Sequence, residues 1–238
     1  MSDDKSVPLG RPAALFSGAL FLAGALLLLW GALLHAPTEK VMGDVQRIFY
    51  FHVPAASNAM LAFVLSGVAA IAYLATRRSG WDEIGRAAVE TGTLWATIVL
   101  ITGPIWARSA WGTWWTWEPR LTTSLITWLI FLGAMLVRKV SHNAEQSARL
   151  ASVIAIVGVL NLPVVYLSVH WWRGNHPVIF KRGAEGALAP EMWTAFICGM
   201  IGVTLMHVAL LYAAWRTAQL EDAVSARERL MEIEESER

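Results

Sequence analysis

Apolar residues gather into six long runs along the chain, separated by short polar or charged segments. Each run has about 17 to 25 residues, the length that a helix needs to cross a hydrocarbon core about 30 Å thick. Within lipid, every backbone N–H and C=O must be bonded inside its own segment, so these runs are expected to be helices. The pattern predicts an all-α polytopic membrane protein with six transmembrane helices. The runs are Ala13–Leu34, Ala55–Thr76, Thr91–Ala107, Leu121–Val137, Leu150–Val169 and Met192–Trp215.

The flanking segments complete the domain organisation. The first run is longer than the apolar core of a cleaved signal, about 7 to 15 residues, so we expect it to remain as an anchor. Residues 1–215 are expected to form one membrane domain that includes an outer Trp-rich loop, 106–120, because no repeat or long linker divides them. Residues 216–238 form a charged tail, with apolar residues at helical spacing, that we expect to extend the last helix.

The distribution of basic residues predicts an orientation. Six spans place both termini on one side, and 12 of the 19 Lys and Arg residues lie on that side. The positive-inside rule therefore predicts that both termini, and the tail, are cytoplasmic. The connections on the opposite side are called outer here.

Composition excludes several classes of function. Charged residues make up only 16% of the chain and the net charge is +1, which argues against nucleic acid as a partner. The single cysteine, Cys198, excludes an internal disulfide and any zinc or iron–sulfur site built from several thiolates.

The outer connection between the third and fourth spans is unusually rich in tryptophan, and reads WARSAWGTWWTWEPR over 106–120. An aromatic belt at the headgroup layer accounts for only one or two tryptophans per helix end. If this stretch is a short helix, Trp111, Trp114, Trp115 and Glu118 share one face and Pro119 ends it. Such a surface suits a large, planar, apolar ligand that stacks on indoles. The tryptophans are Trp106, Trp111, Trp114, Trp115 and Trp117.

Histidines are also concentrated on the outer side. A single histidine is more often a hydrogen-bonded structural residue, but four of the six lie at or beyond the outer ends of spans. His52 stands just before the second span, where Pro54 is expected to fix the first helical turn, and His176 follows the fifth span. Two imidazoles on separate outer segments match the axial ligands of a haem. The four outer histidines are His35, His52, His170 and His176, whereas His142 lies in an inner loop and His207 inside the last span.

Outer cations are candidate partners for the two haem propionates, although loop solubility explains any one of them equally well. A metal site made of three imidazoles would leave the tryptophans unexplained. A hydrolytic triad is also disfavoured, since no outer serine or threonine lies in a strained nucleophile turn. The cations are Arg47, Arg108, Arg120, Arg173, Lys181 and Arg182.

Three separated segments resemble one known family. WGTWWTWEPRLTT is similar to the signature of the tryptophan-rich (WWD-type) haem-handling membrane proteins. FYFHVPAA and NLPVVYLSVHWWRGNHP are similar to the histidine segments of its haem exporter protein C (CcmC) family, from cytochrome c maturation. The signature usually ends in Trp-Asp, and here Glu118 replaces the aspartate. His170 competes with His176 for the second histidine position, and we prefer His176 because it follows the Trp pair.

The resemblance implies a site and a set of partners. It implies that His52 and His176 are the axial and metal ligands of a b-type haem, and that the tryptophan segment binds haem and a chaperone. It further implies that the protein lies in the bacterial inner membrane, works with ABC transporter subunits and presents haem to a periplasmic, membrane-anchored haem chaperone. The residues implied to contact haem are His52, His176, Trp111, Trp114, Trp115, Trp117, Glu118 and Arg120.

We expect a trafficking protein rather than an enzyme, and the sequence leaves open whether it promotes the haem–chaperone bond. The alternative from another class is an integral b-type cytochrome that transfers electrons, although such bundles place paired histidines inside facing helices. A small-solute transporter is a further alternative, for which only Pro104 and the Asn161–Pro163 segment suggest interrupted spans.

Overall fold

A computed structural model describes residues 11–141, 143–172, 174, 176 and 188–236, and its long elements are all α-helices. Six of them are long and apolar enough to cross a membrane, which confirms the predicted all-α fold and the number of spans. Short helical segments, η1 (Trp30–His35), η2 (Asp44–Ile48) and η3 (Pro190–Met192), adjoin them. The long helices are α1 (Arg11–Leu29), α2 (Phe49–Thr76), α3 (Ser79–Trp111), α4 (Pro119–Val140), α5 (Ala144–Trp171) and α6 (Trp193–Ser236).

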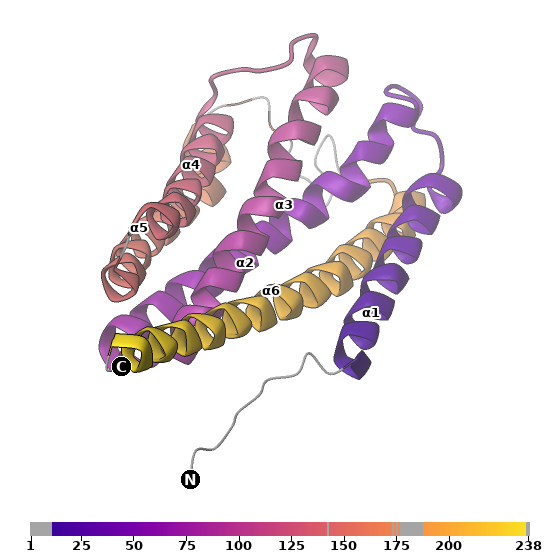
Figure 1. Cartoon of the computed structure of the whole chain (residues 1–238). Helices are drawn as coiled ribbons and strands as arrows, with labels where there is room; N and C mark the ends of the chain where they lie inside the picture. The colour runs from indigo at the N-terminus through magenta and orange to yellow at the C-terminus, as the bar shows by residue number, and fades with distance from the viewer. Residues whose placement is uncertain (1–10, 142, 173, 175, 177–187, 237–238) are drawn as a thin grey trace.

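The helices pack as three pairs. α2 packs against α3, α1 against α6 and α4 against α5, with α2 also touching α5 and α6 (Figure 1). The α1–α2 and α3–α4 connections meet at one end of the bundle, called the loop end below. The start of α1, the α2–α3 connection and the far end of α6 lie toward the other, called the terminal end (Figure 1).

The contact between α1 and α6 depends on small residues. A Cβ on Gly24 would lie 2.5 Å from the Gly202 carbonyl oxygen, and a Cβ on Gly202 would lie 2.6 Å from the Gly24 oxygen. The two backbones therefore touch, as is usual where lipid provides no hydrophobic drive and helices associate by close packing. Across the centre, Phe63 of α2 stacks on Phe131 of α4 with ring centroids 3.8 Å apart.

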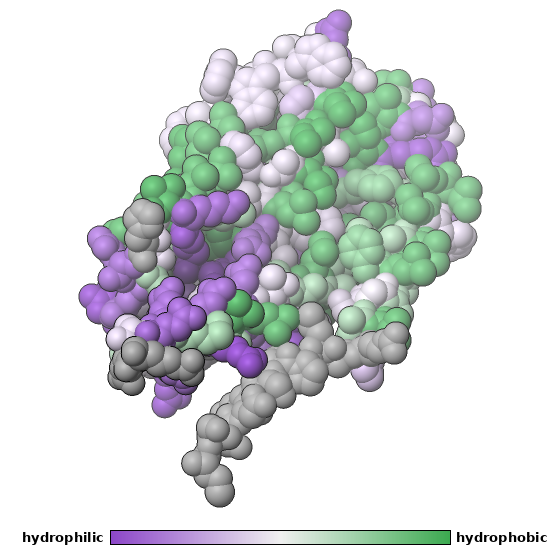
Figure 2. Space-filling view, in the orientation of Figure 1, coloured by the Kyte–Doolittle hydropathy of each residue, from purple (hydrophilic) through white to green (hydrophobic). Residues whose placement is uncertain are grey.

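The exposed surface of the bundle is apolar in the middle, as a bilayer requires, and hydrophilic at the terminal end. Figure 2 shows apolar side chains in a broad band over the visible face and hydrophilic side chains gathered toward the end of α6. That helix has 44 residues, so it is about 66 Å long, roughly twice the thickness of a hydrocarbon core. The expected helical extension through the tail is confirmed as far as Ser236.

Ion pairs join three helices near the terminal end. Arg138 of α4 donates to both carboxylate oxygens of Asp82 on α3, at 2.6 and 3.1 Å. Arg86 of α3 donates to Asp222 of α6 at 2.5 Å and to the carbonyl of Ala218 at 3.3 Å. These ion pairs join the beginning of α3 to the last turn of α4 and to the second half of α6.

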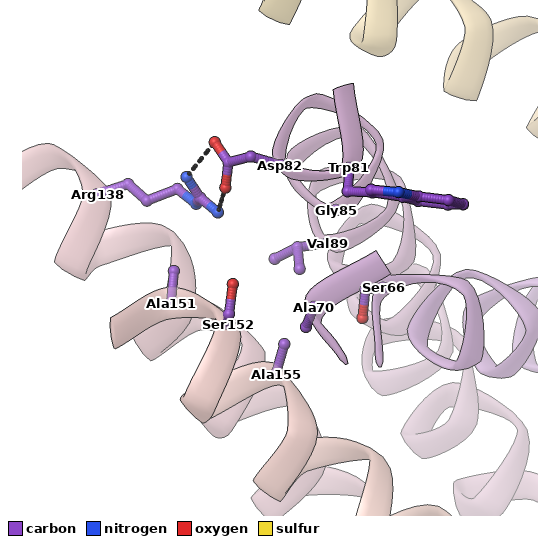
Figure 3. A pocket seen from close by; sticks show the side chains of 10 residues that line it. All are labelled: Ser66, Ala70, Trp81, Asp82, Gly85, Val89, Arg138, Ala151, Ser152 and Ala155. Atoms are coloured by element: carbon purple, nitrogen blue, oxygen red, sulfur yellow. Dashed lines mark hydrogen bonds and ion pairs between the residues drawn. The ribbon is translucent and has the colours of Figure 1, made fainter. Parts of the chain in front are cut away.

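A small hollow opens beside this network and is not suited to a large ligand. Ser66, Ala70, Ser152 and Ala155 line it together with the Asp82–Arg138 pair (Figure 3). Its volume is about 10 Å³, enough for one water, whereas small-molecule sites have roughly 300 to 1,000 Å³. A haem-sized ligand is therefore not expected there.

Candidate functional site

His52 and His176, the two histidines that the sequence singles out, come to the same region at the loop end. His52 belongs to α2, and His176 lies beyond the end of α5. Burial first, and then the positive charge of Arg120 and repulsion from His52, together lower the pKa of His176 to about 3. His176 is therefore a neutral imidazole at physiological pH, the form that binds metals.

The local structure around His52 differs from the expectation that it precedes the helix. The segment η2 leads directly into α2, so His52 lies in the first turn of the helix and Pro54 in the second. Proline is tolerated there because α6 contacts the carbonyl that its missing N–H leaves unbonded. A Cβ on Gly199 would lie only 2.5 Å from the Tyr50 oxygen.

Within the tryptophan segment, residues 106–111 belong to α3 and residues 112–118 form a loop, so the short helix considered for this segment, ended by Pro119, is not what the structure has. α3 ends at Trp111 because Gly112 adopts a left-handed conformation (φ 74°), and its N–H donates to the Arg108 carbonyl at 3.1 Å. Pro119 begins α4 as its first residue, with Glu118 as the extended N-cap. The sequence expectation placed proline after a helix, whereas its fixed φ serves here to start the next one.

Because α3 ends at Trp111 and a loop follows, the tryptophans of the segment do not share one helical face. Trp111 meets His176 edge-on, with ring centroids 6.3 Å apart, and Trp106 packs edge-on against Trp111 at 5.6 Å. These two rings therefore line the histidine side of the loop.

The remaining tryptophans divide between buried and exposed positions. Trp115 packs against Trp117 with centroids 5.8 Å apart, and its indole nitrogen is buried. Trp114 and Trp117 are 59% and 76% exposed. The segment thus presents Trp114 and Trp117 to the surroundings, whereas Trp106, Trp111 and Trp115 lie near His176 or toward the interior.

Glu118 approaches His176 closely. Its Oε1 atom lies 3.9 Å from His176 Nδ1, and the two side chains are only 9% and 23% exposed. A Cβ on Gly174 would lie 2.8 Å from Glu118 Oε2, so glycine there lets the chain pass beside the carboxylate. A small closing movement would make the pair a carboxylate–histidine hydrogen bond.

Arg120 is partly buried in the first turn of α4, within electrostatic range of both histidines and of Glu118. Within the described residues its guanidinium has no hydrogen bond or ion pair at contact distance. Three side-chain atoms close to it in sequence are also buried without a hydrogen-bond partner there: Trp115 Nε1, Thr116 Oγ1 and Thr122 Oγ1. Such atoms are costly unless a ligand or water bonds them. Together with Arg120 they fit a ligand that carries carboxylates.

Two other candidate cations have structural partners. Arg47 donates to the carbonyls of Ala32, Leu33 and Ala36 at 2.7 to 3.1 Å, so it caps the end of η1. Arg108 donates to the carbonyl of Gly112. The candidates Arg173, Lys181 and Arg182 lie outside the described residues.

The other described histidines have ordinary environments. His35 stacks on Trp30 and His170 on Tyr166, and both histidines are exposed. The buried His207 accepts a hydrogen bond from Trp95 Nε1 at 2.9 Å. No group of three His, Cys, Asp or Glu side chains able to hold a metal ion occurs in the part of the chain that the structure describes, and His142 lies outside it.

Thr102 and Gly103 of α3 contact His52, and the sequence analysis did not select them. Thr102 Oγ1 lies 2.9 Å from His52 Nδ1, and a Cβ on Gly103 would lie 3.2 Å from His52 Cε1. The sequence signal that could have pointed to them is a polar residue and a small residue directly before Pro104 in an apolar span. Pro104 itself was interpreted only as a possible interruption of that span.

Comparisons with known proteins assign the chain to a family. The family model described as Heme exporter protein C matches residues 8–230. Heme exporter protein C of Bradyrhizobium diazoefficiens is 35% identical over 193 residues, covering 79% of this chain and 72% of that protein. The Rhodobacter capsulatus protein of the same name is 33% identical, covering 85% and 86%. That of Escherichia coli K12 is 30% identical, covering 71% of each. The matches span the bundle and the loop end alike, and the chain belongs to the Heme exporter protein C family.

Proposed function

We propose that this protein binds haem as cargo at the loop end and passes it on during cytochrome c maturation. The observation that carries the proposal is the convergence of His52 and His176, from separate segments, around the charge of Arg120. Two neutral imidazoles can ligate a haem iron from its two faces. Membership of the Heme exporter protein C family supports the same role.

The haem is held without a covalent bond, as a b-type haem. The c-type attachment of haem forms thioethers with cysteines near the porphyrin, and the only cysteine, Cys198, lies in α6. A Cβ on Gly31 would lie 2.6 Å from the Cys198 Cβ, so this residue faces η1. Axial bonds and contacts with the porphyrin therefore provide the binding, which suits cargo that must leave.

Arg120 neutralises the haem propionates. A partly buried guanidinium gains strongly from a carboxylate partner, since charge-assisted hydrogen bonds are about twice as strong as neutral ones. The buried donors Trp115 Nε1, Thr116 Oγ1 and Thr122 Oγ1 supply further hydrogen bonds to the same groups. Glu118 then orients His176 by accepting from Nδ1, which leaves Nε2 for the iron.

The exposed Trp114 and Trp117 form the surface that meets the receiving haem chaperone. Large aromatic side chains are typical anchors of protein interfaces, and these two adjoin the residues around His176. Family membership supports the further proposal that ABC transporter subunits assemble with the bundle.

The loop end faces the periplasm and both termini face the cytoplasm of a bacterial inner membrane. The excess of Lys and Arg on the terminal side supports this orientation. In a Cys198→Ala background, Ser109→Cys should react with a membrane-impermeant maleimide in spheroplasts, whereas Ser225→Cys should react only after lysis. The reverse pattern would refute the orientation.

A transfer experiment tests the proposed function. The detergent-purified chain is loaded with haem and mixed with apomyoglobin, a high-affinity acceptor, and the haem spectrum is followed with time. A trafficking site should release its haem to the acceptor, and the chaperone should accelerate that release. No haem binding, or haem retained for days in the presence of both, would contradict the proposal, and retention would favour a resident cytochrome.

A further inference from the structure

The imidazole of His52 is held by the neighbouring helix α3. His52 Nδ1 lies 2.9 Å from Thr102 Oγ1, and Thr102 Oγ1 lies 2.7 Å from the carbonyl oxygen of Ile98, one turn earlier. A Cβ on Gly103 would approach His52 Cε1 to 3.2 Å. The His52 ring therefore lies against α3, where the Thr102 hydroxyl contacts Nδ1 and Gly103 leaves space for Cε1.

The hydrogen-bond chain determines which ring nitrogen carries the proton. A threonine hydroxyl has one hydrogen to donate, and Thr102 donates it to the Ile98 carbonyl. Its oxygen can then only accept from His52, so the proton of the neutral imidazole lies on Nδ1. The lone pair remains on Nε2, at the other side of the ring.

We propose that Thr102 is a positioning residue that keeps His52 in the Nδ1–H form, with Nε2 presented to the iron of haem. This inference rests on the proposed function, because it assigns the ligating atom of the proposed haem site. Histidine ligands of metals generally donate their second N–H to an outer partner, which orients the ring and makes the ligating nitrogen more basic. Gly103 assists by leaving space for the ring in that orientation.

His207 provides an internal contrast. Trp95 can only donate through its indole nitrogen, so His207 Nδ1 must be the acceptor of their 2.9 Å hydrogen bond. The proton of neutral His207 therefore lies on Nε2, the opposite form from His52. His52 and His207 thus differ in proton position, and of these two only His52 keeps Nε2 available for a metal.

Nitrogen NMR of the haem-free protein tests the proton position directly. The full chain, labelled with ¹⁵N-histidine, is measured in bilayers, and His52→Ala and His207→Ala assign the two signals. We expect Nδ1 protonated in His52 and Nε2 protonated in His207. Thr102→Val removes the acceptor and should move His52 toward the Nε2–H form, whereas Thr102→Ser should keep the native form. Nε2 protonated in native His52, or no change in Thr102→Val, would overturn the inference.

Haem binding provides the second measurement. Thr102→Val should weaken haem binding about tenfold, at the lower end of what lost outer-partner hydrogen bonds to metal ligands cost, and should raise the reduction potential. Thr102→Ser should restore both values. A native affinity and a native potential in Thr102→Val would refute the role.

Thr97→Val is the matched control for folding. Thr97 also lies in α3, donates to a carbonyl one turn earlier at 2.7 Å, and accepts from Trp128 Nε1 at 2.9 Å. Thr97→Val should lower the stability about as much as Thr102→Val does, without changing the His52 signal or the haem affinity. If the native chain binds no haem, the proposed function fails, while the NMR measurement on the haem-free protein still decides the proton position.

Discussion

The two ends of the bundle treat buried polar groups in opposite ways. At the terminal end, Asp82 and Arg138 form a two-bonded pair, and Arg86 reaches Asp222 on α6. At the loop end, His176 Nδ1 and Trp115 Nε1 are buried without a hydrogen-bond partner among the described residues. Paired charges hold the helices to one another, whereas buried polar atoms without a hydrogen-bond partner are suited to bind a ligand. Stability and binding should therefore be separable by mutation.

The largest expected effect is the loss of a histidine ligand. His52→Gly or His176→Gly should weaken haem binding by at least about 100-fold, since changes in outer partners alone cost 10- to 100-fold. Added imidazole should restore part of the haem spectrum in either variant. The matched control is His170→Gly, which removes an exposed histidine near the loop end. Equal affinity in the three variants would show that His52 and His176 are not ligands of the haem.

Breaking the terminal ion pair should affect only stability. Asp82→Asn removes a charge that is 12% exposed and should lower the free energy of unfolding by about 2 kcal/mol, as expected for hydrogen bonds to charged groups. Thermal unfolding in detergent measures the loss. Glu145→Gln, at an exposed pair with Arg149, should cost less than about 0.5 kcal/mol. A haem affinity that falls with Asp82→Asn would show that the ends are coupled.

Arg120→Gln should weaken haem binding by about tenfold, because one charge-assisted hydrogen bond is lost. Haem dimethyl ester, which lacks ionised propionates, should bind the native protein and Arg120→Gln equally. Arg47→Gln is the control at the same end, since Arg47 caps η1, and it should lower stability without changing haem affinity. If the variant discriminates against the ester as the native protein does, Arg120 does not meet the propionates.

The smallest effects are expected at the exposed tryptophans. Trp117→Ala should change the free energy of unfolding by less than about 0.5 kcal/mol, since the side chain is 76% exposed. Haem affinity should stay native, while transfer to the chaperone slows. Trp111→Ala, beside His176, should instead lower affinity several-fold with transfer affected only in proportion. A native transfer rate in Trp117→Ala would exclude that residue from the docking surface.

The fold was predictable because membrane helices leave a plain signal. Long apolar runs predict the number and order of helices, and the tail's helical spacing predicts the extension of α6 to Ser236. The boundaries were less predictable, since helices continue beyond the apolar runs. α3 begins at Ser79 and not near Thr91, because its first turns carry the ion pairs of the terminal end.

The site was predictable only in part. His52, His176 and Arg120 were selected from residue type and position, but the short helix considered for the tryptophan segment does not form, because Gly112 ends α3 in a left-handed conformation. The contacts of Thr102 and Gly103 with His52 depend on how α2 packs on α3. His52 and Thr102 are 50 residues apart in the sequence. Periodicity within one segment carries no information on such a contact.

We propose above that His52 and His176 ligate one haem together. Electron paramagnetic resonance and absorption spectra of the haem-loaded protein, compared with His52→Ala and His176→Ala, test this pairing. We expect a low-spin ferric haem with two imidazole ligands in the native protein, and a high-spin haem or none in each variant. A native low-spin spectrum in either variant would contradict it.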